Sequence, residues 1–360
     1  MEEATLDAAC NFRGNARPVC LVCGGSTCLK FIKADRKFFK CECGFVFIWP
    51  RPSEDQLQEI YQRDGQEYWT TDAMMQFAFS PSKSRREIAF LRRFTSSGRL
   101  LDIGCSTGSF VKAAIDCGFH AEGIDICEPA VEAGQRLGLP LAVRDVIRDE
   151  MKREYDVVTL WATLEHLADP MSTLRRASDL LRCGGLLVVS VPNYASLTQL
   201  LLHKWDRYVC DEHLNYFTPR VLADVVESHG LHVAGKITFG FNPLMILKDL
   251  ANRGRKSVNC QQMSRDEAQT LRLKESLLQC AQRAAERMLN LISAGDALAI
   301  AAIKTTSHAR SEESELAQRK SIRISEQGDP SSPSDAQDRA CHGNALEAMF
   351  PRRLVASEVI

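Results

Sequence analysis

A regular alternation of short apolar runs and helical stretches begins at residue 99 and constrains the fold more than any other feature. The predicted strands are Arg99–Ile103, Ala121–Ile126, Leu141–Val143, Tyr155–Trp161 and Leu186–Val191, with helices between them at 109–117, 128–137 and 170–182. Strand and helix in alternation predict an α/β fold with a parallel sheet and right-handed crossovers. Two further strands, Leu231–Phe239 and Ala297–Lys304, enclose a long helical insert over 243–293.

The composition is that of an ordinary globular protein, and it excludes several function classes. The 360 residues are 45% hydrophobic and 25% charged, and the net charge is −1, so nothing pulls the chain toward nucleic acid or an anionic membrane. Apolar runs such as Ala297–Ile303 are too short to span a bilayer, and the N-terminus lacks the pattern of a signal peptide. Fourteen cysteines in such a chain indicate a reducing compartment. We therefore expect a soluble, cytoplasmic protein without nucleic-acid or membrane partners.

Composition shifts divide the chain into five expected segments. These are a flexible N-terminus (1–17), a metal-binding ribbon (18–52), a helical linker or cap (53–98), an α/β domain (99–306) and a disordered tail (307–360). Ser53 followed by Gln56 has the spacing of a capping box, which predicts a helix start just after the ribbon. The tail is polar and rich in serine, and it cannot bury enough apolar surface to offset its ordering entropy.

The stretch "RLLDIGCSTGSF" is the most informative one for function. A strand ends in Asp102, Gly104 permits a tight turn, and Gly108 leads into a helix whose free N–H groups favour an anionic group. Asp125 ends the next strand, where a nucleotide-binding fold places a carboxylate for ribose hydroxyls. Asp145 ends the third strand and can accept a hydrogen bond from an adenine amino group, with Val146 against the ring.

These glycines are spaced G-x-x-x-G, and an acidic residue precedes the first one. A nicotinamide-binding unit would show G-x-G-x-x-G instead, so the pattern favours the sulfonium cofactor S-adenosylmethionine. The full set of predicted cofactor-binding residues is Asp102, Gly104, Cys105, Thr107, Gly108, Asp125, Ile126, Asp145, Val146 and Trp161.

Four cysteines near the N-terminus form two close pairs, Cys20 with Cys23 and Cys41 with Cys43. Each pair is followed by a glycine, as in zinc knuckles, and four thiolates match a tetrahedral structural Zn²⁺ site. Cys28 or Cys10 could replace a ligand if the shortened second pair supplies only one. Basic and acidic residues are nearly balanced over 1–95, so we expect a structural or substrate-contacting ribbon rather than one that binds phosphates.

The segments "LLDIGCSTGSF", "GIDICEPAVEAG", "YDVVTLWATLEHLADP" and "LRCGGLLVVSVPN" resemble the class I S-adenosylmethionine-dependent methyltransferases, in particular the branch with ubiquinone O-methyltransferases and sugar methyltransferases. The resemblance implies a Rossmann-like, seven-stranded sheet with an antiparallel last strand, and methyl transfer to a small molecule. Ser106 departs from it, because the family usually has glycine there. The cysteine region is similar to a zinc ribbon that precedes this domain in many bacterial sugar and natural-product methyltransferases, where the second pair is usually CxxC.

The candidate catalytic residues lie after the fourth and fifth strands, because ligands bind at the carboxyl ends of parallel strands. His166, next to Glu165, and His213, near Asp211, Glu212 and Tyr216, are both candidates for a general base. Each histidine could equally support its loop, and in related O-methyltransferases a Glu-His pair can help hold a divalent cation. Tyr68 and Trp69 either close over the cofactor or belong to a small core.

We expect an enzyme that transfers a methyl group by in-line displacement to a small polar acceptor, such as a sugar, a nucleotide sugar, or a natural-product or quinone-like intermediate. The alternative is a non-catalytic accessory protein that binds the cofactor and contacts a partner through the ribbon and tail. The insert at 243–293 either shapes the acceptor pocket or forms a homodimer contact.

Overall fold

The computed structural model describes residues 17–33, 35–53, 56–57, 59, 81–151, 154–202, 212–240, 285 and 287–305. The predicted flexible N-terminus, the tail, most of the insert, and Cys10, Tyr68, Trp69 and Asp211 therefore lie outside the described residues. Among the helices of the described part, none is both long and apolar enough to cross a bilayer.

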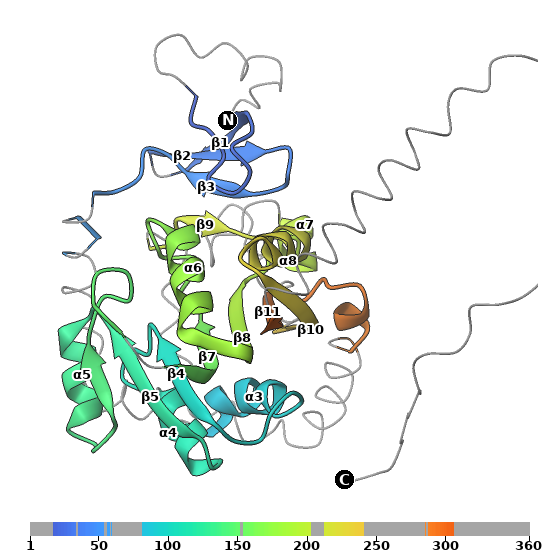
Figure 1. Cartoon of the computed structure of the whole chain (residues 1–360). Coiled ribbons are helices and arrows are strands. Elements are labelled where there is room, and N and C mark those ends of the chain that lie inside the picture. The colour runs from blue at the N-terminus through green and yellow to red at the C-terminus, as the bar shows by residue number, and fades with distance from the viewer. Residues whose placement is uncertain are drawn as a thin grey trace, which may run out of the picture. The chain divides into compact units, whose positions relative to one another are not determined.

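A seven-stranded mixed sheet forms the centre of the chain, in the order β10-β11-β8-β7-β4-β5-β6 (Figure 1). Its strands are β4 (Arg99–Ile103), β5 (His120–Asp125), β6 (Leu141–Val143), β7 (Tyr155–Trp161), β8 (Leu181–Pro192), β10 (Leu231–Phe239) and β11 (Ala297–Lys304). The strands from β8 to β6 are parallel, whereas β11 is antiparallel to both β8 and β10. The predicted α/β class and seven-stranded sheet are confirmed, and β8 begins five residues before its predicted start.

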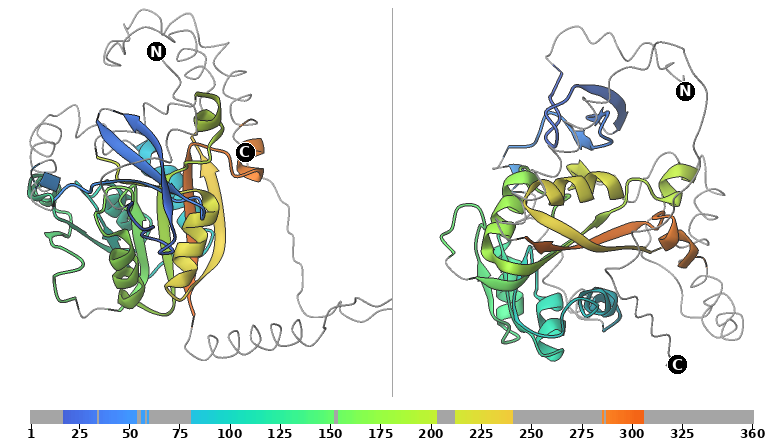
Figure 2. Two further views of the ribbon diagram at one scale, coloured as in Figure 1. Left: turned by 90° about the horizontal axis from the view of Figure 1, so that it is seen from above. Right: turned by 45° about the vertical axis from the view of Figure 1, so that its right-hand side comes forward.

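Helices cover the two faces of this sheet (Figure 2). One face carries α3 (Pro81–Leu91), α4 (Ser109–Asp116) and α5 (Glu128–Gln135), and the other carries α6 (Pro170–Leu180) and α8 (Pro219–Ser228). A shorter helix, α7 (Leu197–Leu202), follows β8. Side chains cap both helices of the second face, because Asp169 accepts a hydrogen bond from the Ser172 N–H and Thr218 accepts one from the Val221 N–H. Each face of the sheet has its own buried apolar cluster.

A second, smaller sheet has the order β1-β2-β3-β9, with β1 (Thr27–Lys33), β2 (Arg36–Cys41), β3 (Val46–Ile48) and β9 (Asn215–Tyr216). The first three strands are the strand-rich cysteine region, but the fourth comes from far along the chain and was not predicted. Phe45 of this region packs against Phe217, with ring centroids 5.1 Å apart, and the two sheets share one core cluster. Just after β3, Ser53 and Gln56 form the predicted capping box through two reciprocal hydrogen bonds.

Candidate functional site

The loop between β4 and α4 lies at the carboxyl edge of the parallel strands. Gly104 has a φ of 75°, and a Cβ at this position would lie 2.4 Å from Thr163 Oγ1, so only glycine fits. The N–H groups of Gly104 and Cys105 both donate to the carbonyl of Ile124, at 2.8 and 3.1 Å. Gly108 also has positive φ and precedes α4, and Thr107 before it is buried. The loop is thereby fastened to β5 before any ligand is considered.

Asp102 is buried at the end of β4 and accepts a hydrogen bond from Thr159 Oγ1 at 2.6 Å. Burial raises the pKa of this carboxyl to about 8, the Thr159 hydrogen bond opposes that rise, and the charges of Glu87 and Asp125 add to it. Asp102 is therefore largely protonated at neutral pH until a cation approaches it.

Asp125, at the end of β5, joins two loops. Its Oδ2 accepts from the Ser106 N–H at 2.7 Å, and its Oδ1 accepts from the Cys127 N–H at 2.9 Å. Burial raises the pKa of Asp125, while the backbone donors of Cys127, Ser106 and Ile126 lower it. Because each carboxylate oxygen has two lone pairs, both can still accept a hydroxyl donor.

Ser106 occupies an unusual backbone conformation between these two acids. Its φ is 50°, in the left-handed region that L side chains rarely adopt, which explains why glycine is usual at this position. Its Oγ is buried and has no hydrogen-bond partner among the described residues. A buried hydroxyl of this kind would normally be satisfied, so a bound molecule could supply its partner.

The remaining predicted cofactor residues lie along the same edge. Asp145 accepts from the Ile147 N–H at 2.8 Å in a turn after β6, and Ile126 is 44% exposed beyond β5. Val146 is buried in the core, so its side chain packs against the sheet. Trp161 ends β7, and its buried Nε1 has no hydrogen-bond partner within the described part of the chain.

The structure brings Glu165 and His166, which share the loop between β7 and α6, together with His213 from the segment before β9. One nitrogen or oxygen atom of each lies within 4.8 Å of the others, and the two imidazole rings are 4.6 Å apart in an edge-to-face arrangement. His166 Nδ1 contacts the Glu212 carbonyl at 3.2 Å, and Tyr216 donates to the His213 carbonyl at 3.0 Å. The arrangement can accept, hold and pass on a proton.

The electrostatics of Glu165 and His166 follow from burial. Burial raises the pKa of Glu165 to about 8, and one of its oxygens, Oε2, has no hydrogen-bond partner among the described residues. Burial, followed by the proximity of His213, lowers the pKa of His166 to about 3. At neutral pH this pair is therefore a protonated carboxyl beside a neutral imidazole.

Two residues that the sequence did not single out hold these loops. Asn215 Nδ2 donates to the carbonyl of Leu167 at 2.8 Å, and Arg51 Nη2 donates to Asn215 Oδ1 at 2.5 Å. Arg51 lies between two prolines after β3, in a stretch that looks like a simple connector. What marks it is that its guanidinium contacts two distant loops and its Nε is buried, and both features follow only from the tertiary structure.

The four cysteines of the smaller sheet converge. Cys20 and Cys43 have sulfurs 3.7 Å apart, those of Cys23 and Cys41 are 3.5 Å apart, and all four lie within 4.8 Å of one another. Both turns are tight, because the Gly24 N–H donates to the Cys20 carbonyl and the Gly44 N–H donates to the Cys41 carbonyl. The shortened second pair thus still presents both of its sulfurs to the cluster, without Cys28.

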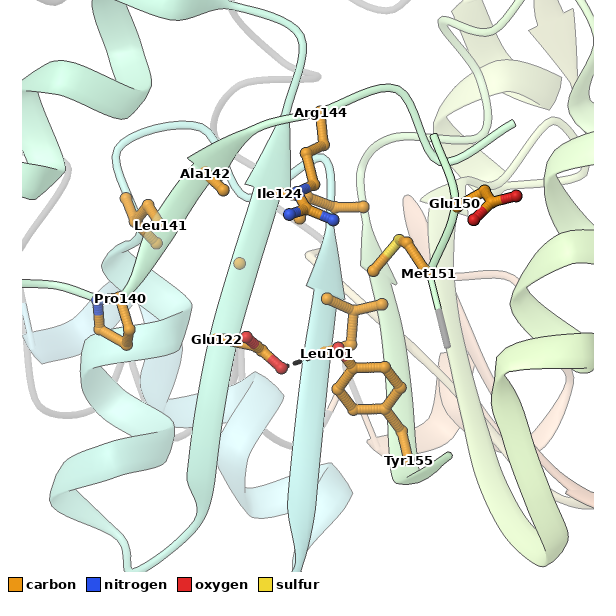
Figure 3. Close-up of a pocket in the computed structure, with 11 residues that line it drawn as sticks. Leu101, Glu122, Ile124, Pro140, Leu141, Ala142, Arg144, Glu150, Met151 and Tyr155 are labelled. Atoms are coloured by element: carbon orange, nitrogen blue, oxygen red, sulfur yellow. Dashed lines mark hydrogen bonds between the residues drawn. The ribbon is translucent and has the colours of Figure 1, made fainter. Parts of the chain in front are cut away.

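A cavity of about 470 Å³ lies against the strands β4, β5 and β6 (Figure 3). Leu101, Ile124 and Met151 line it, and Tyr155 donates to Glu122 Oε1 at 2.7 Å across its floor. Asp102 and Asp125, at the carboxyl ends of β4 and β5, are not among the residues that line it. The cavity is therefore separate from the candidate site.

Methyltransferases are among the known proteins to which this chain is similar. A family model described as a methyltransferase domain matches residues 77–234. A ubiquinone biosynthesis O-methyltransferase of Aeromonas salmonicida is 30% identical over 161 residues, which cover 41% of this chain and 68% of that protein. The corresponding protein of Aromatoleum aromaticum is 28% identical over 169 residues, covering 43% of this chain and 72% of its own length.

Among solved structures, an S-adenosylmethionine-dependent methyltransferase from Archaeoglobus fulgidus is similar, with a TM-score of 0.44 and 19% identity. The match covers 68% of this chain and 99% of that one.

The strained backbone of Ser106 leads to a stability prediction. We expect Ser106→Gly to raise the free energy of unfolding by about 0.5–1 kcal/mol, because glycine adopts positive φ without strain and removes an unsatisfied hydroxyl, which together outweigh its greater unfolded-state entropy. Ala113→Gly, in the middle of α4, should instead lower it by a similar amount. Urea denaturation of both variants measures this, and a loss of stability in Ser106→Gly would contradict the account.

Proposed function

Because this chain belongs to the class I S-adenosylmethionine-dependent methyltransferases, we propose that it methylates a small polar acceptor, such as a sugar, a nucleotide sugar, or a natural-product or quinone-like intermediate. The observation that carries the proposal is that two acids, the buried Asp102 and the half-buried Asp125, lie at the same edge of the sheet as the histidines of two neighbouring loops. A binding edge for the cofactor beside a proton-accepting cluster is what methyl transfer to a hydroxyl or amine requires.

The residues at this edge fit S-adenosylmethionine. In this proposal Asp102 faces the cofactor's ammonium group, and Asp125 accepts hydrogen bonds from the ribose hydroxyls. Ser106 Oγ and Trp161 Nε1 are buried polar atoms for which the bound cofactor would offer partners. Asp145 would accept from the adenine amino group. The cofactor, when bound, supplies an activated methyl group, and the chain's part is to orient the acceptor and take up its proton.

We assign the general base to His213 rather than His166. A pKa of about 3 makes His166 a weak base at neutral pH, so it is better suited to hold the ring of its neighbour edge-on. Glu165, with a pKa raised to about 8, is protonated at neutral pH and can donate a hydrogen bond to the cluster. Tyr216 fixes the His213 loop through its hydrogen bond to the His213 carbonyl.

The four cysteines are proposed to bind a structural Zn²⁺. Tetrahedral Zn²⁺ with Zn–S bonds of about 2.3 Å places its sulfurs about 3.8 Å apart, and the shorter Sγ–Sγ distances here, 3.5 and 3.7 Å, come close to that spacing. Four sulfurs leave no open position, so the ion would stabilise the small sheet and take no part in chemistry. A cytoplasmic location, where the thiols stay reduced, suits such a site.

Separate variants should divide cofactor binding from turnover. We expect Asp125→Ala to weaken S-adenosylmethionine binding by at least about tenfold, because the ribose hydroxyls lose a charged acceptor. His213→Ala should keep that affinity and lose turnover, while Asp116→Ala, an exposed acid of α4, should change neither.

Calorimetry measures the affinity, and formation of S-adenosylhomocysteine with a panel of sugar, nucleotide-sugar and phenolic acceptors measures turnover. Full turnover in His213→Ala would remove the base assignment. A wild-type chain that binds the cofactor but releases no S-adenosylhomocysteine with any acceptor would favour the accessory-protein alternative.

The raised pKa of Asp102 predicts a pH dependence of cofactor affinity. Below its pKa of about 8 the free protein holds a proton on Asp102, and the cofactor's cationic groups favour the ionised form, so binding must release that proton. Affinity should therefore rise with pH, by up to about tenfold per unit below pH 8, and level off above it. Asp102→Asn should remove this slope, which calorimetry across the pH range would show.

Metal removal provides the test of the cysteine site. We expect one Zn²⁺ per chain in the purified protein, and we expect a chelator to lower the melting temperature because metal binding contributes folding free energy. Cys43→Ser should reproduce this effect, whereas Cys183→Ser, an exposed cysteine elsewhere, should not. Metal analysis that finds no zinc in the wild-type chain would refute the site.

A further inference from the structure

The segment that carries His213 is built into the cysteine-bearing sheet. β9 begins two residues after His213 and pairs antiparallel with β3, with Val46 opposite Tyr216 and Phe47 opposite Asn215. The Ile48 N–H extends this pairing by donating to the Leu214 carbonyl at 3.1 Å. Movement of β3 therefore moves the backbone next to His213.

The same segment holds the loop that carries Glu165 and His166. The N–H groups of Leu214 and Asn215 both donate to the Glu165 carbonyl, at 2.8 and 3.0 Å. The Asn215 side chain adds hydrogen bonds from Nδ2 to the carbonyls of Leu164 and Leu167, at 3.1 and 2.8 Å. These bonds set the two loops at a fixed separation, and with it the 4.6 Å between the two imidazole rings.

Arg51, which follows the cysteine region, forms hydrogen bonds to both of these loops. Its Nη2 donates to Asn215 Oδ1 at 2.5 Å and its Nη1 to the Leu167 carbonyl at 3.4 Å, so one guanidinium spans both loops. The group lies 5.9 Å from the Phe47 ring. Burial lowers the pKa of Arg51 to about 10, which the charge of Asp169 opposes, so the side chain stays cationic at neutral pH.

We propose that Arg51 is a positioning residue for methyl transfer, which acts from the cysteine region through Asn215 and Leu167 to set the separation of His166 and His213. This inference rests on the proposed role of the histidines. The Asn215 carboxamide is already committed to three carbonyls, and its oxygen is oriented by Arg51. A planar fork with two donors can serve both acceptors at once, which the single ammonium of a lysine does less well.

The test compares Arg51→Met and Arg51→Lys with Arg220→Met, which alters an arginine whose side chain is 87% exposed on α8. The readouts are histidine NMR signals, the rate at which diethyl pyrocarbonate modifies His166 and His213, S-adenosylhomocysteine affinity and bound zinc. His166→Asn and His213→Asn assign the two sites among the eight histidines.

In both Arg51 variants we expect shifted signals for His166 and His213, and a modification rate of His166 that rises about tenfold as its loop loosens. S-adenosylhomocysteine affinity should stay within about twofold of the wild type, because the cofactor loop makes none of these contacts. Arg220→Met should match the wild type throughout. A purely structural role would lower the melting temperature and leave the histidine signals unmoved, and that result would overturn the proposal.

Should Arg51→Met fail to fold, Asn215→Asp decides the matter. It keeps an acceptor for Arg51 but removes the donors to the carbonyls. The histidine signals must therefore shift if Arg51 acts through Asn215 as proposed. The histidine readouts need no acceptor. A wild-type chain that gives no turnover would thus count against the proposed function alone, while unmoved histidine signals would count against Arg51 alone.

Discussion

The parallel pairing of β4 with β5 on one side and β7 on the other is the constraint on which the site depends. Because parallel strands end at a common edge, this pairing delivers the loops that follow three different strands to one place. Hydrogen bonds then lock the loops to each other: Gly104 and Cys105 to Ile124, and Ser106 to Asp125. The candidate site is thus an outcome of backbone geometry before any side-chain chemistry is added.

The sheet could be predicted because its signal is local. Apolar runs and helical periods between Arg99 and Val191 each specify one element, and the turn after Asp102 carries its own glycines. The pairing of β9 with β3 could not be predicted, because β9 is a two-residue strand whose partner lies about 170 residues earlier. Arg51 and Thr159 carry no sequence mark either, since their importance lies in the buried groups they meet.

Each half of the candidate site contains one buried acid. Asp102 and Glu165 are both almost fully buried and have pKa values raised to about 8, so each is stored in its neutral form in the absence of a cation. Neutral carboxyls cost less to bury than ionised ones, which lets the fold hold acidic groups in its interior. Charge appears only when a partner stabilises it, and this couples binding at this edge to the release of protons.

The fourth strand of the small sheet also bears on how the chain is made. β3 is synthesised early, and its edge stays unpaired until β9 has left the ribosome, well over a hundred residues later. An exposed strand edge is a template for wrong partners, and long-range pairings form slowly. The Zn²⁺ proposed for the four cysteines would keep this sheet folded while the rest of the chain emerges. The cluster would then limit wrong pairing of β3 during synthesis and stabilise the small sheet in the folded protein.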